Sequence, residues 1–126
     1  MPSWGEVLTS VFDSVTSALK VKLVGDSGSS LSTPATVGHG RKTVASAGTA
    51  EALNASTACK SVVVTAETDN TGVIVVGGSG VLNTLASRTG TPLNAGESMS
   101  LDIGNLSAVF VDASVTGDGV TYTYTV

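Results

Sequence analysis

The first 24 residues carry a hydrophobic pattern that differs from the rest of the chain. Between residues 3 and 19, apolar residues recur every three or four positions, which is the period of one face of an α-helix. Ser3 and Glu6 have the spacing of a capping box, in which both side chains bond free backbone N–H groups of the first turn. Residues 20–24 then alternate like a short strand. We therefore expect residues 1–24 to form an amphipathic arm.

A stretch of low-complexity sequence separates this arm from the C-terminal two-thirds of the chain. Residues 25–40 read GDSGSSLSTPATVGHG and contain few side chains able to build a core. Chains rich in Gly and Ser behave as flexible linkers. The expected organisation is an arm over 1–24, a Gly/Ser/Thr linker over 25–40 and a folded domain over 41–126.

From residue 41 onward, short β-branched and apolar runs alternate with turn residues. Seven strands are predicted, over 43–47, 50–53, 61–66, 72–76, 98–103, 108–113 and 120–126. A long connection over 77–92 separates the fourth from the fifth and contains a helical turn over 82–87. This pattern predicts a mainly all-β fold, a compact β-sandwich or jelly-roll-like domain of about seven short strands. The last run alternates so regularly that we expect it at a sheet edge or between subunits.

Composition narrows the class of protein. The 126 residues suffice for one domain with a short arm. Only 13% are charged, against about 25% in ordinary soluble domains, so Ser, Thr, Asn and Gly must cover the surface. This is typical of extracellular and virion β-proteins. The net charge is −4 and the six basic residues are scattered, so we expect no nucleic-acid partner, since phosphate binding needs clustered Lys and Arg.

The sequence predicts neither a disulfide nor a membrane partner. Its single cysteine, Cys59, excludes an intrachain disulfide and a thiolate metal cage. No basic segment precedes an apolar run at the N-terminus, so no signal peptide is expected. The longest apolar stretch, over 73–76, is far shorter than the roughly 20 residues of a membrane-spanning helix.

Residues that could support catalysis are sparse and separated. His39, the only histidine, falls in the linker, where a general base would be poorly positioned. Cys59 lies beside Lys60, which can favour a thiolate, but a small buried hydrophobic role is expected. The carboxylates have no informative spacing; a calcium site from Asp112 and Asp118 is the one metal alternative. We therefore expect that the protein is not an enzyme and has no catalytic residue, no cofactor and no metal site.

Two further features bear on ligand binding. The glycines of Gly77–Gly80 follow a strand but lack the Lys-Ser/Thr of a phosphate-binding loop, which indicates a flexible turn. Tyr122 and Tyr124 share one strand face and offer only a thin platform for a sugar. Together with the 77–92 segment, they define the surface of an alternative function, ligand binding.

The arm is the strongest functional feature of the sequence. It either folds back to cover one sheet or packs against copies of itself or another protein. Part of it fits the a and d positions of two heptads, although two heptads are a weak coiled-coil signal. The predicted partner-binding residues are Trp4, Leu8, Val11, Phe12, Val15 and Leu19.

Several short motifs resemble one class of viral protein. Val11-Phe12-Asp13-Ser14 followed by residues 18–24 (ALKVKLV) resembles the N-terminal segment of small tailed-bacteriophage virion proteins, in which it precedes a Gly/Ser linker. Residues 62–64 (VVV), 72–80, 92–98 (PLNAGES) and 109–113 (VFVDA) resemble the β-domain often found with that segment.

The resemblance implies a virion structural protein of the head-decoration or head-fibre type. Such a protein is expected to be a homotrimer, anchored by its N-terminal segment to the major capsid protein or another virion protein. It is localised in the virion, which assembles in the host cytoplasm. In such proteins the segment can be extended rather than helical. The alternative function is a receptor- or glycan-binding module of a tail fibre or adhesin; a hydrolase is the least favoured.

Overall fold

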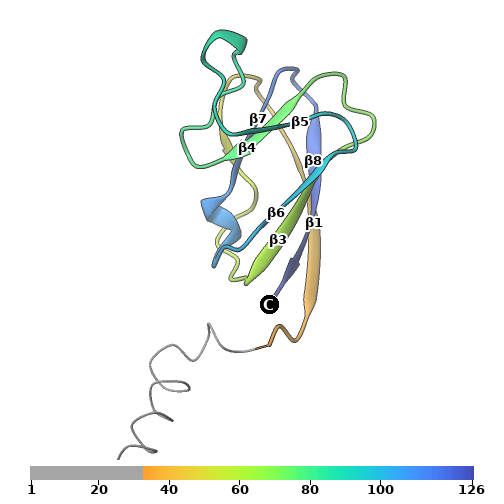
Figure 1. Cartoon of the computed structure of the whole chain (residues 1–126), viewed down its shortest axis with the longest axis vertical. Helices are drawn as coiled ribbons and strands as arrows, with labels where there is room; N and C mark the ends of the chain where they lie inside the picture. Colours follow the sequence, from red (N-terminus) through yellow and green to blue (C-terminus); the bar gives the residue numbers. More distant parts are fainter. Residues whose placement is uncertain (1–32) are drawn as a thin grey trace, which may run out of the picture. The chain divides into compact units, whose positions relative to one another are not determined.

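A computed structural model describes residues 33–126 of the chain, within which Pro34–Val126 form one compact unit. The arm and most of the expected linker lie outside the described residues, as do all six predicted partner-binding residues: Trp4, Leu8, Val11, Phe12, Val15 and Leu19. The described part is an all-β sandwich, as the sequence predicts (Figure 1). Its strands are β1 (Val37–Thr43), β2 (Glu51–Ala52), β3 (Ser61–Ala66), β4 (Ile74–Gly77), β5 (Thr91–Leu93), β6 (Ser98–Leu101), β7 (Phe110–Ala113) and β8 (Gly119–Thr125).

The strands pair in a nested order. β1 pairs with β8, β2 with β7, β3 with β6 and β4 with β5, all antiparallel. The segment from β1 to β8 is thus one long hairpin with its turn between β4 and β5. Two further pairings, β3 with β8 and β4 with β7, roll this hairpin into the sheets β1-β8-β3-β6 and β2-β7-β4-β5. Eight strands in this arrangement form a jelly roll, one of the two expected sandwich types.

The core lies between the two sheets. In β3, Val62, Val64 and Ala66 point inward and are fully buried, while the residues between them are exposed or half-buried. This alternation of β-branched residues is what the pleat of a half-buried strand requires. Leu53, Ile74 and Leu106 are the largest fully buried residues, and burying such a side chain stabilises the fold by about 1.5–3 kcal/mol.

The first strand begins earlier than expected. β1 occupies Val37–Thr43 rather than residues 43–47, so residues 37–40 of the expected linker, with His39, belong to the sheet. Gly38 and Gly40 gave this segment a linker-like composition, but their role is steric. A Cβ on either glycine would lie 2.3 Å from an atom of Tyr124 or Tyr122, respectively. The glycines therefore allow an edge strand to pass close to two tyrosine rings.

Two other expectations need correction. The last strand is not at an edge: β8 lies between β1 and β3, because its inward residues Val120 and Tyr122 are core residues. Residues 33–126 contain eight strands rather than about seven, because the sequence pattern did not predict β5. Pro92 in the middle of β5 argues against a strand, yet β5 is an edge strand, where a residue without an N–H is tolerated. The expected helical turn is present as the 3₁₀ helix η1 (Leu85–Ser87).

Candidate interaction surface

The two reactive side chains considered in the sequence, His39 and Cys59, lie in different environments. His39 is exposed on β1. Cys59 is buried, with its Sγ atom 3.1 Å from the carbonyl oxygen of Ile103. Burial raises the pKa of the Cys59 thiol, which disfavours the reactive thiolate. The interpretation of Cys59 as a small buried residue is therefore confirmed.

Asp112 is a fully buried carboxylate that binds backbone. Its Oδ1 atom accepts hydrogen bonds from Gly48 N at 2.9 Å and Ala113 N at 2.8 Å, and its Oδ2 atom accepts one from Asn83 N at 2.8 Å. Such bonds compensate the cost of burying the charge. Asp112 thereby fixes two loops, residues 45–50 and 78–90, to strand β7.

Asp118 also accepts hydrogen bonds from backbone N–H groups, but from the segment between β3 and β4. It accepts hydrogen bonds from Thr71 N at 3.1 Å and Gly72 N at 2.7 Å. Asp112 and Asp118 therefore bind different segments and do not share a ligand-binding geometry. Across residues 33–126, no three His, Cys, Asp or Glu side chains come together as metal ligands.

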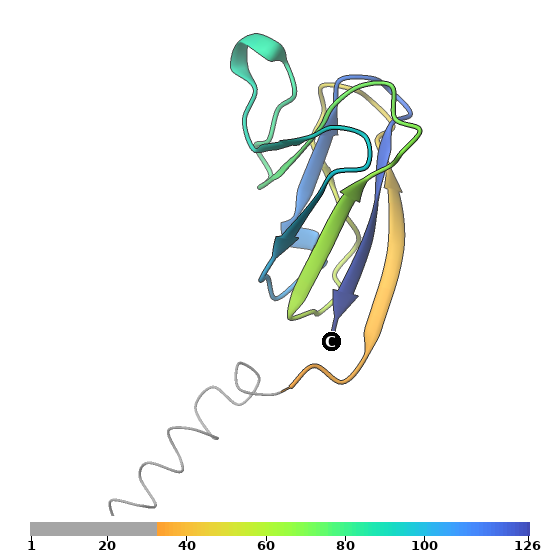
Figure 2. The ribbon, with the colours of Figure 1, turned by 45° about the vertical axis from the view of Figure 1, so that its right-hand side comes forward.

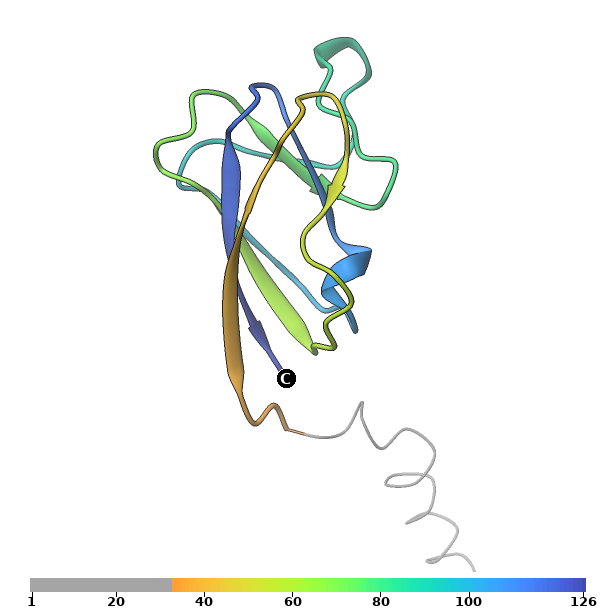
Figure 3. The same ribbon diagram turned by 180° about the vertical axis from the view of Figure 1, so that it is seen from behind.

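Residues 78–90 form a projecting loop, seen at one end of the sandwich in Figure 3. Asn83 is buried at its base, where its Nδ2 atom donates to the carbonyl oxygens of Val73 and Asp112. Arg88 Nε donates to Asn83 Oδ1 at 2.8 Å. The base is thus held by several bonds, while the tip exposes Leu85, which is 83% accessible. The loop is a preorganised projection with an apolar apex.

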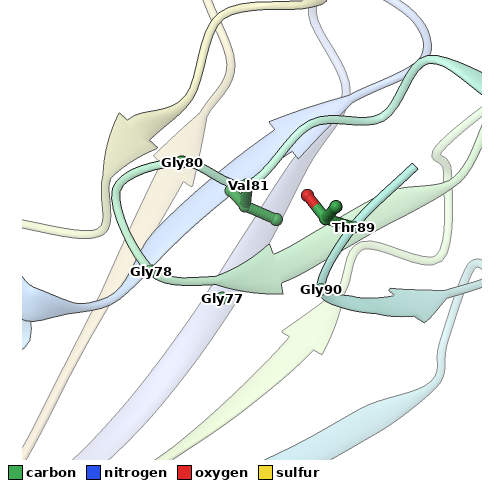
Figure 4. Close-up of a pocket in the computed structure, with 6 residues that line it drawn as sticks. All are labelled: Gly77, Gly78, Gly80, Val81, Thr89 and Gly90. Carbon is green, nitrogen blue, oxygen red and sulfur yellow. The ribbon is translucent and has the colours of Figure 1, made fainter. Parts of the chain in front are cut away.

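An open pocket lies at the foot of this loop (Figure 4). Its volume is about 280 Å³. Four of its six lining residues are glycines, so its walls are largely backbone. The lining residues are Gly77, Gly78, Gly80, Val81, Thr89 and Gly90. No titratable side chain is among them, and the hydroxyl of Thr89 is the one polar side-chain group in the lining, so the pocket would hold a small ligand mainly by shape and backbone contacts.

The two tyrosines do share one face of β8, but it is the inner face. Tyr122 is only 6% accessible and belongs to the core, and Tyr124 packs against that core. Their ring centroids are 6.2 Å apart. The pair therefore stabilises the end of the sandwich and does not provide a displayed stacking platform.

The outer surface of the sheet β1-β8-β3-β6 is the broadest uncovered strand surface in the described part of the chain. Figure 2 shows β1, β8 and β3 side by side in this sheet. We call eleven of its outward residues the hydroxyl face, because seven of them are Ser or Thr. They are Val37, His39, Arg41, Ser61, Val63, Thr65, Ser98, Ser100, Thr121, Thr123 and Thr125.

The hydroxyl groups of this face bond to one another across strands. Ser61 Oγ lies 2.8 Å from Thr125 Oγ1, and Thr65 Oγ1 lies 2.7 Å from Ser98 Oγ. The one permanent charge among the eleven, that of Arg41, is paired with Glu67 through two contacts, one of them 3.0 Å long. The alternation of Thr and Ser in residues 61–65 and 121–125 was the sequence signal for this face, and it was missed because the same alternation also fits a covered strand.

The comparisons add no relative. Neither protein-family models, nor curated proteins, nor solved structures give a match to the chain. No helix within residues 33–126 has the length and apolar character needed to cross a membrane.

Proposed function

We propose that this chain is a non-enzymatic phage virion structural protein, decorating or anchored to the capsid surface and acting through subunit contacts. The observation that carries the proposal is the nested strand order of the jelly roll, an architecture used by viral capsid domains and by lectins. Because one fold serves many functions, this support is an analogy. It agrees with the motif resemblance to head-decoration and head-fibre proteins.

The use of the acidic side chains also supports a structural role. Asp112 and Asp118 hold loops through backbone N–H groups, and Glu67 pairs with Arg41. These carboxylates rigidify the domain. In this proposal, the domain over 34–126 is the displayed unit, and the apolar residues of the arm attach it to the major capsid protein or to further copies of the chain.

The arm provides the direct test. Phe12→Asp together with Val15→Asp should abolish incorporation into virions, because both substitutions place a charge in the apolar stripe, where its burial is costly. The full-length variant and the wild type would be produced during infection by a phage encoding the chain, and quantified in purified particles. Ser10→Asp together with Ser17→Asp adds the same charge at polar positions of the arm and should leave incorporation unchanged.

The result depends on the comparison of these two variants. Equal occupancy of wild type and the Phe12/Val15 variant would refute the anchoring role of the arm. Absence of the wild-type chain from purified particles would refute the virion proposal itself.

One observation favours the alternative, a receptor- or glycan-binding module of a tail fibre or adhesin. The loop over 78–90 is rigid at its base, exposes Leu85 and has an open pocket at its foot. A ligand would protect this loop from proteolysis, and a glycan array probed with the full chain would identify a sugar. A negative array would weigh against this function. The orientation of Tyr122 and Tyr124 into the core already removes the stacking platform that the sequence suggested.

A further inference from the structure

Within residues 33–126 the two sheets have four edges, and three of these carry features that prevent pairing with another strand. β2 has only two residues, and β5 has three with Pro92 in the middle. β6 has four residues and lies between the exposed residues Glu97 and Asp102. Short strands, proline and charge are the devices by which natural proteins keep sheet edges from associating. The fourth edge, β1, has seven residues without a proline, and all seven pair with β8 in unbroken register.

The cations of β1 are already paired within the domain. Arg41 donates to the Glu67 carboxylate through Nε and through Nη2, the latter at 3.0 Å. Lys42 Nζ lies 3.1 Å from Glu51 Oε1. Charged side chains, Lys above all, normally protect an edge strand. Here a carboxylate of the same domain balances each charge, so the repulsion of an approaching strand is reduced.

Every second residue of β1 directs its backbone groups toward the open edge. Thr36, directly before β1, exchanges backbone hydrogen bonds with Val126, and the bond from Val126 N to Thr36 O is 2.9 Å long. In an antiparallel pair alternate residues make such bonds, so the odd-numbered residues of β1 point their N–H and C=O groups away from β8. β1 is the end strand of its sheet (Figure 2), and no other strand within residues 33–126 pairs with these groups. The outward-directed residues are Val37, His39, Arg41 and Thr43.

We infer that β1 pairs with β1 of a second copy of this chain, antiparallel and across a twofold axis at Gly40. The inference goes beyond the proposed virion role and does not depend on it. In this register Val37 lies opposite Thr43 of the second copy and His39 lies opposite Arg41, and the same two pairs recur beyond the axis. Each pair exchanges two N–H···O bonds, so every outward-directed group of both strands obtains a partner. At the axis Gly40 faces Gly40, and no side chain stands between the two backbones.

The side chains of β1 suit a second copy as the partner. Neither Arg41 nor Lys42 faces its own counterpart in this register, and Lys42 lies opposite Gly38; like charges directly opposite each other would destabilise the pair. Val37, which is 70% accessible, would be partly covered by Thr43 of the second copy. Because β1 is the one unprotected edge among the described strands, the pairing closes at two domains and does not extend into a fibre.

The pairing is expected to be weak by itself. A single strand along one edge buries less than the roughly 1,200 Å² of a stable standard interface, and its hydrogen bonds replace bonds to water. We therefore expect association that depends on concentration, and that is strengthened where other contacts hold copies close together.

Sedimentation of the full chain over a range of concentrations tests this inference, and the average mass should rise with concentration. His39→Pro removes an outward-directed N–H that β8 does not use, so the domain should stay folded, as β5 does with Pro92. This variant should associate at least about tenfold more weakly. Ser100→Pro is the matched control, because Ser100 lies three residues after Glu97, whose carbonyl accepts from Ala66 N on β3, and its own N–H therefore faces the open edge of β6. It should associate like the wild type.

Crosslinking tests the register without a proline. Residues of a hydrogen-bonded antiparallel pair have Cα atoms about 5.5 Å apart, which suits a disulfide, and the native Cys59 is buried. A mixture of a Val37→Cys chain and a Thr43→Cys chain should form a mixed disulfide dimer under mild oxidation as concentration rises. Either chain alone should crosslink far less, because its two introduced thiols would lie about 20 Å apart along the paired strands.

A wild-type mass that is independent of concentration, equal association of the two proline variants, or a mixture that crosslinks no better than its separate chains would each overturn the inference. Slow hydrogen exchange of the His39 N–H in the dilute chain would overturn it as well, and would assign the β1 edge to the chain's own residues 1–32.

Discussion

Removing the carboxylate of Asp112, which lies in strand β7, should destabilise the domain strongly, because this carboxylate holds two loops. Asp112→Ala removes the acceptor of three backbone N–H groups, of which those of Asn83 and Ala113 are buried. A buried donor without a partner costs about 1–3 kcal/mol. With the more accessible Gly48 N–H contributing less, we expect a loss of about 3–5 kcal/mol.

The loss is large enough to measure by thermal unfolding. A loss of 1 kcal/mol lowers Tm by about 4–8 °C in a domain of this size, so the midpoint should fall by more than about 12 °C. Circular dichroism would follow unfolding. Trypsin cleavage after Arg88 would report release of the 78–90 loop, because Arg88 is held there by Asn83. Cleavage should be faster in the variant well below its Tm.

Two comparisons make the reasoning refutable. Asp112→Asn keeps an oxygen for the bonds at Oδ1 but turns an amide group toward Asn83 N, so it should lose about half as much stability. Asp102→Ala removes an exposed carboxylate that follows β6, and should change stability by less than about 0.5 kcal/mol. If Asp112→Ala unfolds at the same temperature as Asp102→Ala, Asp112 does not organise the two loops.

Two further predictions concern β1 and its surroundings. Gly40→Ala should lower the free energy of unfolding by about 1–3 kcal/mol, because the added methyl group overpacks against Tyr122. Gly104→Ala is the control: a Cβ there meets open space, so urea unfolding should show a neutral or slightly stabilising effect. Equal effects of the two substitutions would refute the steric role of Gly40. Burial opposes ionisation of Glu51, but the Lys42 ammonium, 3.1 Å away, and backbone N–H groups outweigh it and lower the Glu51 pKa. The stabilisation is therefore complete above the ordinary glutamate pKa of about 4.3 and is lost as the pH falls through the lowered pKa of Glu51. The advantage of wild type over Glu51→Gln should be present near about pH 7 and shrink steadily as the pH falls below about 4.3; an advantage independent of pH would contradict this.

The fold class was predictable because most strands carry a local signal. The run over 61–66 alternates valines with polar residues, and β3 has these bounds. The strand order was not predictable, because it depends on which faces meet across the chain. The regular alternation of β8 was interpreted as an edge signal, but the same alternation suits a central strand whose outer face is uncovered.

The errors at β1 and β5 have a physical cause in residues with two meanings. Gly38 and Gly40 are typical of linkers, yet here they make room for tyrosines that lie more than 80 residues later in the sequence. Pro92 usually argues against a strand but is permitted at an edge. The hydroxyl face was not predicted for a similar reason. Whether a Thr-rich strand face is covered depends on loops whose positions no local sequence pattern indicates.

The nested pairing has a consequence for how this protein is made. β8 is the last of the eight strands to be synthesised, yet it lies in the middle of its sheet and is the pairing partner of both β1 and β3. Until β8 leaves the ribosome, β1 has no neighbour and β3 has only β6. Domains dominated by such distant pairings fold slowly. The nascent domain must therefore wait, with its valine-rich strands unpaired, until nearly all of it has been translated, which makes chaperone access during synthesis a determinant of its yield.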